Sequence, residues 1–188
     1  LQLGHSDLAR FSGLAGRALG GRVDGVISGS YTPLSGAFDL ETSVSGNDVS
    51  TSQPDLDRLL MGDSRIRASV RRDTQGLVLR SLDLQTRGLS GQAQGVLQSA
   101  YSDVSASLAL ADLAVLERGW KGALGTNLRL SGANGARQIE LDGMGTALSI
   151  GAPELDRLLA GDTTLTLVAH ETTGGFALAN LQLSNPMI

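Results

Sequence analysis

The chain has 188 residues, of which 41% are hydrophobic and only 3% aromatic, and its net charge at pH 7 is −4. An acidic balance argues against a nucleic-acid partner and weakly against anionic membrane surfaces, because both attract basic proteins. The chain has no cysteine, which excludes disulfides and cysteine-ligated metals. We recognise no signal-peptide pattern in residues 1–188, and no apolar run there approaches the ~20 residues of a membrane span. Both ends read as strand, so we expect residues 1–188 to be one fragment of a longer, elongated protein.

The first elements in chain order are a glycine-rich segment, a strand and a short helix. Residues 7–21 open with Asp7-Leu8-Ala9 and end in two glycines. Residues 36–46 alternate between apolar and polar side chains, which is typical of a strand with one dry and one wet face. Residues 54–62 begin with proline and end with glycine, which are start and stop signals of a helix. A helix of about two turns is unstable alone in water, so its leucines must cover another part of the fold.

Two further strands are predicted after this helix, and the second changes phase. Residues 65–71 alternate between apolar side chains and arginine or serine. Leu77 and Leu79 share one parity, whereas Leu82 and Leu84 share the other. A phase change sends side chains to opposite faces unless a bulge intervenes. We therefore predict a bulge or kink here, at which the sheet bends.

The second half of the chain repeats the first. Residues 104–110 and 124–130 alternate again, and residues 54–63 return as 153–162 with eight of ten positions identical, an offset of 99. Similarity at a fixed period marks one structural unit used more than once. We expect repeat units of about 7–111 and 112–188, the second incomplete, each with one short helix. The leucines expected to plug the interior of the sheet are Leu56, Leu59, Leu60, Leu155, Leu158 and Leu159.

The predicted fold class is mainly β. The apolar strand faces have few helices to cover them, so the sheet either closes as a barrel or sandwich or curves into an open trough. Small residues on the dry faces favour the trough: a curved, U-shaped sheet with a hydrophobic concave face. The residues predicted to line this groove are Phe38, Leu40, Val44, Ile66, Val70, Val104, Leu108, Leu128, Leu130, Leu165 and Leu167.

A resemblance to a known family rests on the order of several weak motifs. These are the segment from Asp7-Leu8-Ala9 to Gly20-Gly21 with the strand after it, Leu82-Asp83-Leu84, and Ala111-Asp112-Leu113-Ala114. In this order they resemble the TamB family, the inner-membrane subunit of the translocation and assembly module, within the AsmA-like group. The resemblance covers essentially the whole chain. Fourteen of the 15 basic residues are arginine, a bias of GC-rich genomes that suggests an alphaproteobacterial source.

The resemblance implies a taco-shaped sheet in the periplasm of a Gram-negative bacterium, as part of an inner-membrane-anchored protein. Family members are linked to outer-membrane biogenesis, to phospholipid movement between the membranes, and to protein secretion through autotransporter assembly. We therefore expect the groove to carry phospholipid acyl chains, or to shield nascent outer-membrane protein strands. An outer-membrane barrel partner of the TamA type is implied for the full protein, and contact with this fragment is left open. No cofactor is expected.

No catalytic constellation is recognisable, so we expect no enzyme. The two histidines, His5 and His170, lie far apart in the sequence with no motif around them. No serine sits in a nucleophile-elbow context, and no phosphate-binding loop is present. We interpret both histidines as ordinary surface or turn residues, with no metal site.

The repeated charged residues have structural interpretations. We expect Asp57-Arg58 and Asp156-Arg157 to form ion pairs within the helix or with the sheet, and Asp63 and Asp162 to accept hydrogen bonds from backbone amides. The arginines of residues 65–72 fit a solvated outer strand face or, alternatively, contacts with lipid headgroups at the groove rim. They are Arg65, Arg67, Arg71 and Arg72.

The alternative function is a purely structural β-solenoid or adhesin-type scaffold with a closed core. Such folds repeat every 20–30 residues or so, far below the period of 99 seen here. Carbohydrate binding would favour exposed aromatic side chains, of which this chain has few.

Overall fold

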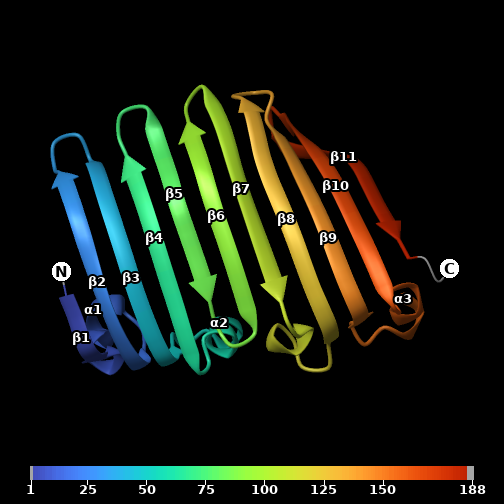
Figure 1. Ribbon diagram of the computed structural model, residues 1–188, viewed down its shortest axis with the longest axis horizontal. Coiled ribbons are helices and arrows are strands. Elements are labelled where there is room, and N and C mark those ends of the chain that lie inside the picture. The colour runs from blue at the N-terminus through green and yellow to red at the C-terminus, as the bar shows by residue number, and fades with distance from the viewer. Residues whose placement is uncertain (1, 186–188) are drawn as a thin grey trace.

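Eleven strands form one open antiparallel sheet, in which each strand pairs with the next in sequence (Figure 1). The computed structural model describes residues 2–185. The prediction of a mainly β chain is confirmed. In chain order the elements, with η for a 3₁₀ helix, are β1 (Gln2–Asp7), η1 (Leu8–Phe11), α1 (Ser12–Ala15), β2 (Gly20–Thr32), β3 (Ala37–Ser50), α2 (Pro54–Leu59), β4 (Asp63–Arg72), β5 (Gly76–Gln85), β6 (Leu89–Gln98), β7 (Tyr101–Leu110), η2 (Leu113–Val115), β8 (Lys121–Ala133), β9 (Gln138–Ser149), α3 (Pro153–Leu158), β10 (Asp162–Thr172) and β11 (Gly175–Ser184).

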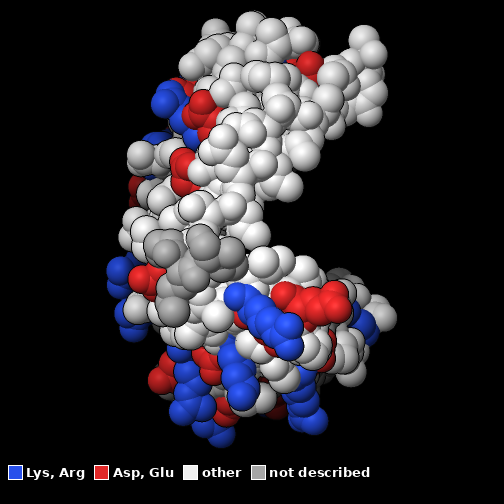
Figure 2. Space-filling view, turned by 90° about the vertical axis from the view of Figure 1, so that its right-hand side faces the viewer, with Lys and Arg blue, Asp and Glu red and all other residues white. Residues whose placement is uncertain are grey.

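The sheet is curved, as predicted. Viewed along the row of strands, the molecule has a C-shaped outline whose hollow is lined by uncharged residues (Figure 2). Most of the charged side chains visible in this view lie on the outer side and toward the end that carries the helices. All the helices of the described chain lie at one end of the strands (Figure 1), so most of the sheet has no second layer over it.

The predicted phase change in β5 is a β-bulge. Ser69 pairs with Ser81 but Val70 pairs with Leu79, which leaves Arg80 as the extra residue. The same irregularity occurs in β11, where the pairing skips Ala179. Because each bulge restores the phase, the leucines on both sides of it share one face of the sheet.

The two halves of the chain also share unusual backbone geometry at an offset of 99 residues. Gly62 and Gly161, at the ends of α2 and α3, have φ of 79° and 84°. Asp48 and Ala147 have φ of 49° and 51°, although neither is glycine. Left-handed conformations are unfavourable for residues with a Cβ, so their recurrence at matching sites reflects one chain path used twice.

Buried apolar residues are few in the described chain. They are Val23, Leu110, Leu113 and Ala169, each no more than 9% exposed. Leu113 comes from η2, and Leu110 ends the strand before it, so part of this small core lies at the helical end of the sheet. A single layer covers the remaining side chains only from the sides, which leaves them half-buried.

The predicted helix plug is only partly realised. Leu56 is 43% exposed, Leu155 48% and Leu158 45%, so their predicted burial is wrong. Leu59, Leu60 and Leu159 are half-buried. The reason is geometric: each helix has six residues and lies at the strand ends, where part of its surface faces solvent.

Candidate functional site

The strand register places all eleven predicted groove residues on one face of the sheet. Leu40 lies opposite Val70, and Val104 lies opposite Leu130. Directly opposed residues of antiparallel strands share a face, so the register can be followed from strand to strand. The other members connect in the same way, for example Leu108 to Leu165 through the intervening β8 and β9.

Three uncharged rows cross this side of the sheet from β2 to β11, and we call them the apolar face. The middle row is Ile27, Thr42, Ala68, Leu82, Ala93, Ala106, Leu128, Leu141, Leu167 and Leu181. The row nearer the helices is Gly25, Val44, Ile66, Leu84, Gly91, Leu108, Thr126, Gly143, Leu165 and Leu183. The row farther from the helices is Gly29, Leu40, Val70, Leu79, Gly95, Val104, Leu130, Ile139, Ala169 and Leu178.

The last of these rows marks the bend of the sheet. Gly29 and Gly95 both lie in it, with φ of 143° and 144°. A Cβ at either position would lie within 2.2 Å of a carbonyl oxygen of the neighbouring strand, so only glycine fits there. The bulges at Arg80 and Ala179 fall between this row and the middle one. Bending along one line gives the face its trough shape.

The apolar face is open along most of its area. Among its residues Ala169, at 8% exposure, and Gly143 are buried, while Ile66 and Leu108 are 37% and 39% exposed. Exposure rises above 50% for Leu178 and Leu183 on β11, which ends the sheet. Soluble proteins rarely leave a contiguous apolar surface of this kind uncovered, and such surfaces mark binding sites.

The opposite side of the sheet, which we call the polar face, is solvated and held by ion pairs. Arg80 reaches across β4, donating from Nε to Ser69 Oγ at 2.7 Å and pairing with Asp39 on β3. The hydrogen bond from Arg80 lowers the pKa of Asp39. Arg129 pairs with Asp103 at 3.3 Å.

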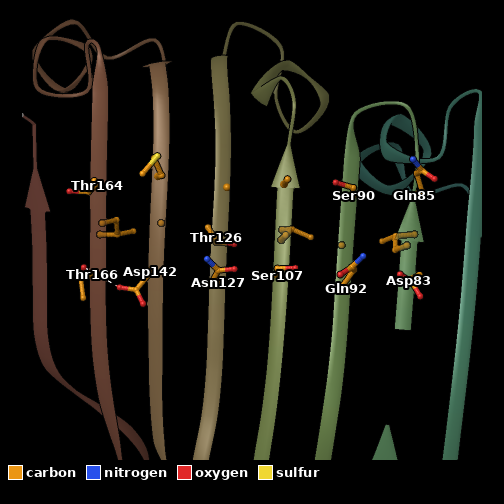
Figure 3. Close-up of a pocket in the computed structure, with 18 of the residues that line it drawn as sticks. Asp83, Gln85, Ser90, Gln92, Ser107, Thr126, Asn127, Asp142, Thr164 and Thr166 are labelled. Carbon is orange, nitrogen blue, oxygen red and sulfur yellow. Dashed lines mark hydrogen bonds between the residues drawn. The ribbon is translucent and has the colours of Figure 1, made fainter. Parts of the chain in front are cut away.

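A hollow of about 820 Å³ is lined mainly by side chains of the polar face, and Leu108 and Leu165 of the predicted groove also border it (Figure 3). One register row crosses it with Asp83, Gln92, Ser107, Asn127 and Asp142 on five consecutive strands. These side chains are polar and exposed, and no aromatic residue lines the hollow. Leu84, Leu108, Met144 and Leu165 also line the hollow, so its surface is mixed polar and apolar, unlike the uncharged rows of the apolar face.

The repeated aspartates of α2 and α3 cap loops instead of forming the predicted ion pairs. Asp57 accepts hydrogen bonds from the Thr51 amide at 2.6 Å and from its hydroxyl at 2.9 Å. Asp156 accepts from the Ile150 amide at 2.7 Å and from the Ser149 hydroxyl at 2.9 Å. In both cases the amide hydrogen bond is the main cause of a lowered pKa of the aspartate. These residues hold the loop before each helix.

Two other predicted contacts differ in detail. Asp63 accepts from the Asn47 side chain at 3.0 Å and Asp162 from the Thr146 hydroxyl at 3.3 Å, so the expected backbone partners are replaced by side chains of the preceding strand. Arg58 contacts Glu117 at 3.8 Å, between α2 and the segment after η2.

Neither metal ligation nor a membrane helix is evident in residues 2–185. No three His, Asp or Glu side chains there are placed to share a metal ion. None of the helices described is long and apolar enough to span a bilayer. His170 is exposed, and the side chain of His5 lies outside the described residues.

No family model matches the chain, and neither a curated protein nor a solved structure is detectably similar to it. Membership of the TamB family therefore stays a prediction from the sequence.

Proposed function

We propose that the apolar face binds phospholipid acyl chains and carries them along the trough, in a periplasmic segment of a TamB-like protein that acts in outer-membrane biogenesis. The observation that carries this proposal is the unbroken, uncharged and open surface from β2 to β11. Carriage of this kind needs no catalytic residue and no cofactor.

The energetics favour a continuous apolar surface over discrete binding sites. Each methylene of an acyl chain exposed to water costs about 0.8 kcal/mol. A surface without charged side chains removes much of this cost at every position, so a chain can move along it without crossing a polar barrier.

The dimensions also suit acyl chains. Eleven strands spaced ~4.8 Å apart give a trough about 48 Å long. One leaflet of a bilayer core is roughly 15 Å thick, half of the ~30 Å hydrocarbon layer. About three acyl chains could therefore lie end to end along the face.

The scaffold alternative has less support. A solenoid with a closed core would bury its apolar side chains, whereas the sheet is open and most of these side chains are half-exposed. Shielding of nascent outer-membrane protein strands uses the same apolar face, and it predicts binding of amphipathic peptide in place of lipid.

A charge placed on the apolar face tests the proposal. The purified chain is incubated with vesicles that contain a fluorescent phospholipid, and the lipid bound per chain is measured after separation. Leu128→Asp should lower bound lipid about tenfold, because a carboxylate in contact with hydrocarbon is unfavourable. Asn127→Asp, its neighbour on the polar face, should bind like the wild type. Equal lipid binding by all three proteins, with circular dichroism confirming that they are folded, would contradict the proposal.

A further inference from the structure

Charged residues are absent from the three apolar rows but occur in the row beyond them, at the strand ends far from the helices. We call this the rim row: Tyr31, Phe38, Arg72, Leu77, Leu97, Ser102, Gly132, Arg137, Glu171 and Phe176. Its three charged members are Arg72, Arg137 and Glu171. The prediction that the arginines of residues 65–72 lie on a solvated outer strand face is therefore wrong for Arg72. Its side chain lies on the same side of the sheet as Phe38 and Leu77.

In the second repeat unit the rim arginine is neutralised. Arg137 pairs with Glu171 at 3.2 Å, and both side chains are largely covered, with 21% and 17% exposed. Arg137 also donates to the Ser102 hydroxyl at 3.0 Å. Glu171 accepts from the amides of Gly135 and Arg137 at 2.8 and 3.1 Å, and these bonds lower its pKa. Within this cluster the opposite charges of Arg137 and Glu171 neutralise each other and their hydrogen-bonding groups find partners. No net charge is left to attract a ligand.

The first repeat unit has a different pair at the same two positions. At the offset of 99 residues, Phe38 takes the place of Arg137 and Arg72 takes the place of Glu171. Phe38 and Arg72 lie directly opposite each other on β3 and β4. Within residues 2–185, Arg72 is exposed and its side chain forms no ion pair or hydrogen bond. The nearby Asp73 pairs with Arg71 at 3.1 Å, and Arg71 lies on the polar face.

We propose that Arg72 binds the phosphate of a phospholipid headgroup at the rim of the trough. This inference rests on the proposed function, because it supplies the polar end of a ligand whose acyl chain lies on the apolar face. A guanidinium matches two phosphate oxygens with paired N–H groups. The aliphatic stem of an arginine packs on apolar neighbours while its charged end reaches water.

The neighbours of Arg72 fit a boundary between hydrocarbon and water. Phe38 lies on one side of it and Leu77 on the other, and Tyr31 follows Phe38 in the same row with 63% of its surface exposed. Tyrosine places an apolar ring and a polar hydroxyl in the position where headgroups meet acyl chains. The rim of the first unit therefore differs from that of the second in both charge and aromatic content.

The test compares a phospholipid with a lipid that lacks phosphate. Binding of phosphatidylglycerol and of diacylglycerol with the same acyl chains is measured for the 188-residue chain. Arg72→Gln should weaken phosphatidylglycerol binding roughly three- to tenfold and leave diacylglycerol binding unchanged. Arg71→Gln is the matched control, since it removes an adjacent arginine from the polar face.

A second variant keeps Arg72 but neutralises its positive charge with a carboxylate placed opposite it. Phe38→Glu places a carboxylate opposite Arg72, in imitation of the second unit, and should weaken phosphatidylglycerol binding as much as Arg72→Gln does. Phe38→Leu should bind phosphatidylglycerol like the wild type. If Phe38→Glu does not fold, as judged by circular dichroism, Arg72→Gln carries the test alone.

The outcomes separate the two proposals. If the wild type binds neither lipid, the proposed function fails. If it binds both and Arg72→Gln binds phosphatidylglycerol normally, the Arg72 proposal is wrong and the proposed function stands. Inorganic phosphate in the millimolar range should not displace phosphatidylglycerol. Efficient displacement would mean that Arg72 binds a free anion and not a phospholipid headgroup.

Discussion

The small core at the helical end should carry much of the stability of the sheet, and Leu110→Ala measures it. Leu110 is 5% exposed, and Leu113 of η2, also 5% exposed, lies three residues further on. The substitution removes the equivalent of about three methylene groups, or roughly 2.4 kcal/mol at ~0.8 kcal/mol each. The enclosed cavity raises the expected loss to about 3–4 kcal/mol. Urea denaturation followed by circular dichroism gives the free energy of unfolding.

Two leucines of graded exposure serve as controls. Leu158 is 45% exposed, so Leu158→Ala should lose about half of the transfer energy without an enclosed cavity, about 1 kcal/mol. Leu34, in a turn, is fully exposed at 102%, so Leu34→Ala should change stability by less than about 0.5 kcal/mol. A loss below about 1 kcal/mol for Leu110→Ala, or equal losses for Leu110→Ala and Leu158→Ala, would refute this reasoning.

Two further predictions concern the aspartates of the repeated loops and a pair of glycines. The lowered pKa values of Asp57 and Asp156 mean that both contribute stability above the unfolded-state pKa of about 3.9, and lose it as pH falls through their folded values. The urea midpoint should therefore fall between about pH 5 and pH 3, and it should fall less in the double variant Asp57→Asn, Asp156→Asn; an equal fall would contradict the loop-capping role. Gly122→Ala should destabilise by more than about 1 kcal/mol, because φ is 96° and a Cβ would lie 2.5 Å from a carbonyl oxygen. In the same urea assay Gly13→Ala, in α1 with nothing within 4 Å, should be neutral or stabilising, and equal effects of the two glycine changes would refute the argument.

Local patterns in the sequence were enough to predict much of the sheet. Strict alternation in residues 36–46 predicts a strand with two different faces, and β3 covers that range. The change of parity between Leu79 and Leu82 predicts the bulge, because two apolar pairs of opposite phase can share one face only if a residue is skipped. Alternation also predicts which side chains share a face once the strands are paired in order.

Burial and side-chain partners could not be predicted in this way. The leucines of α3 have the same spacing as those of α2, but spacing does not reveal whether another element covers them, and Leu158 stays 45% exposed. The Asp57–Thr51 hydrogen bond depends on how the loop before α2 folds back. To predict which face Arg72 lies on, the alternation must be followed to the last residue of β4, where Arg72 lies opposite Phe38. Pairing of Arg137 with Glu171, by contrast, requires the register of β9 and β10.

The most direct test of lipid carriage is site-specific photo-crosslinking in cells. A photoreactive amino acid replaces Leu40 or Leu128 on the apolar face, and Glu41 or Arg129 on the polar face. After irradiation, the purified protein is analysed by mass spectrometry for covalently attached phospholipid. We predict phospholipid adducts at Leu40 and Leu128 and few or none at Glu41 and Arg129. Equal capture at all four positions would contradict the account.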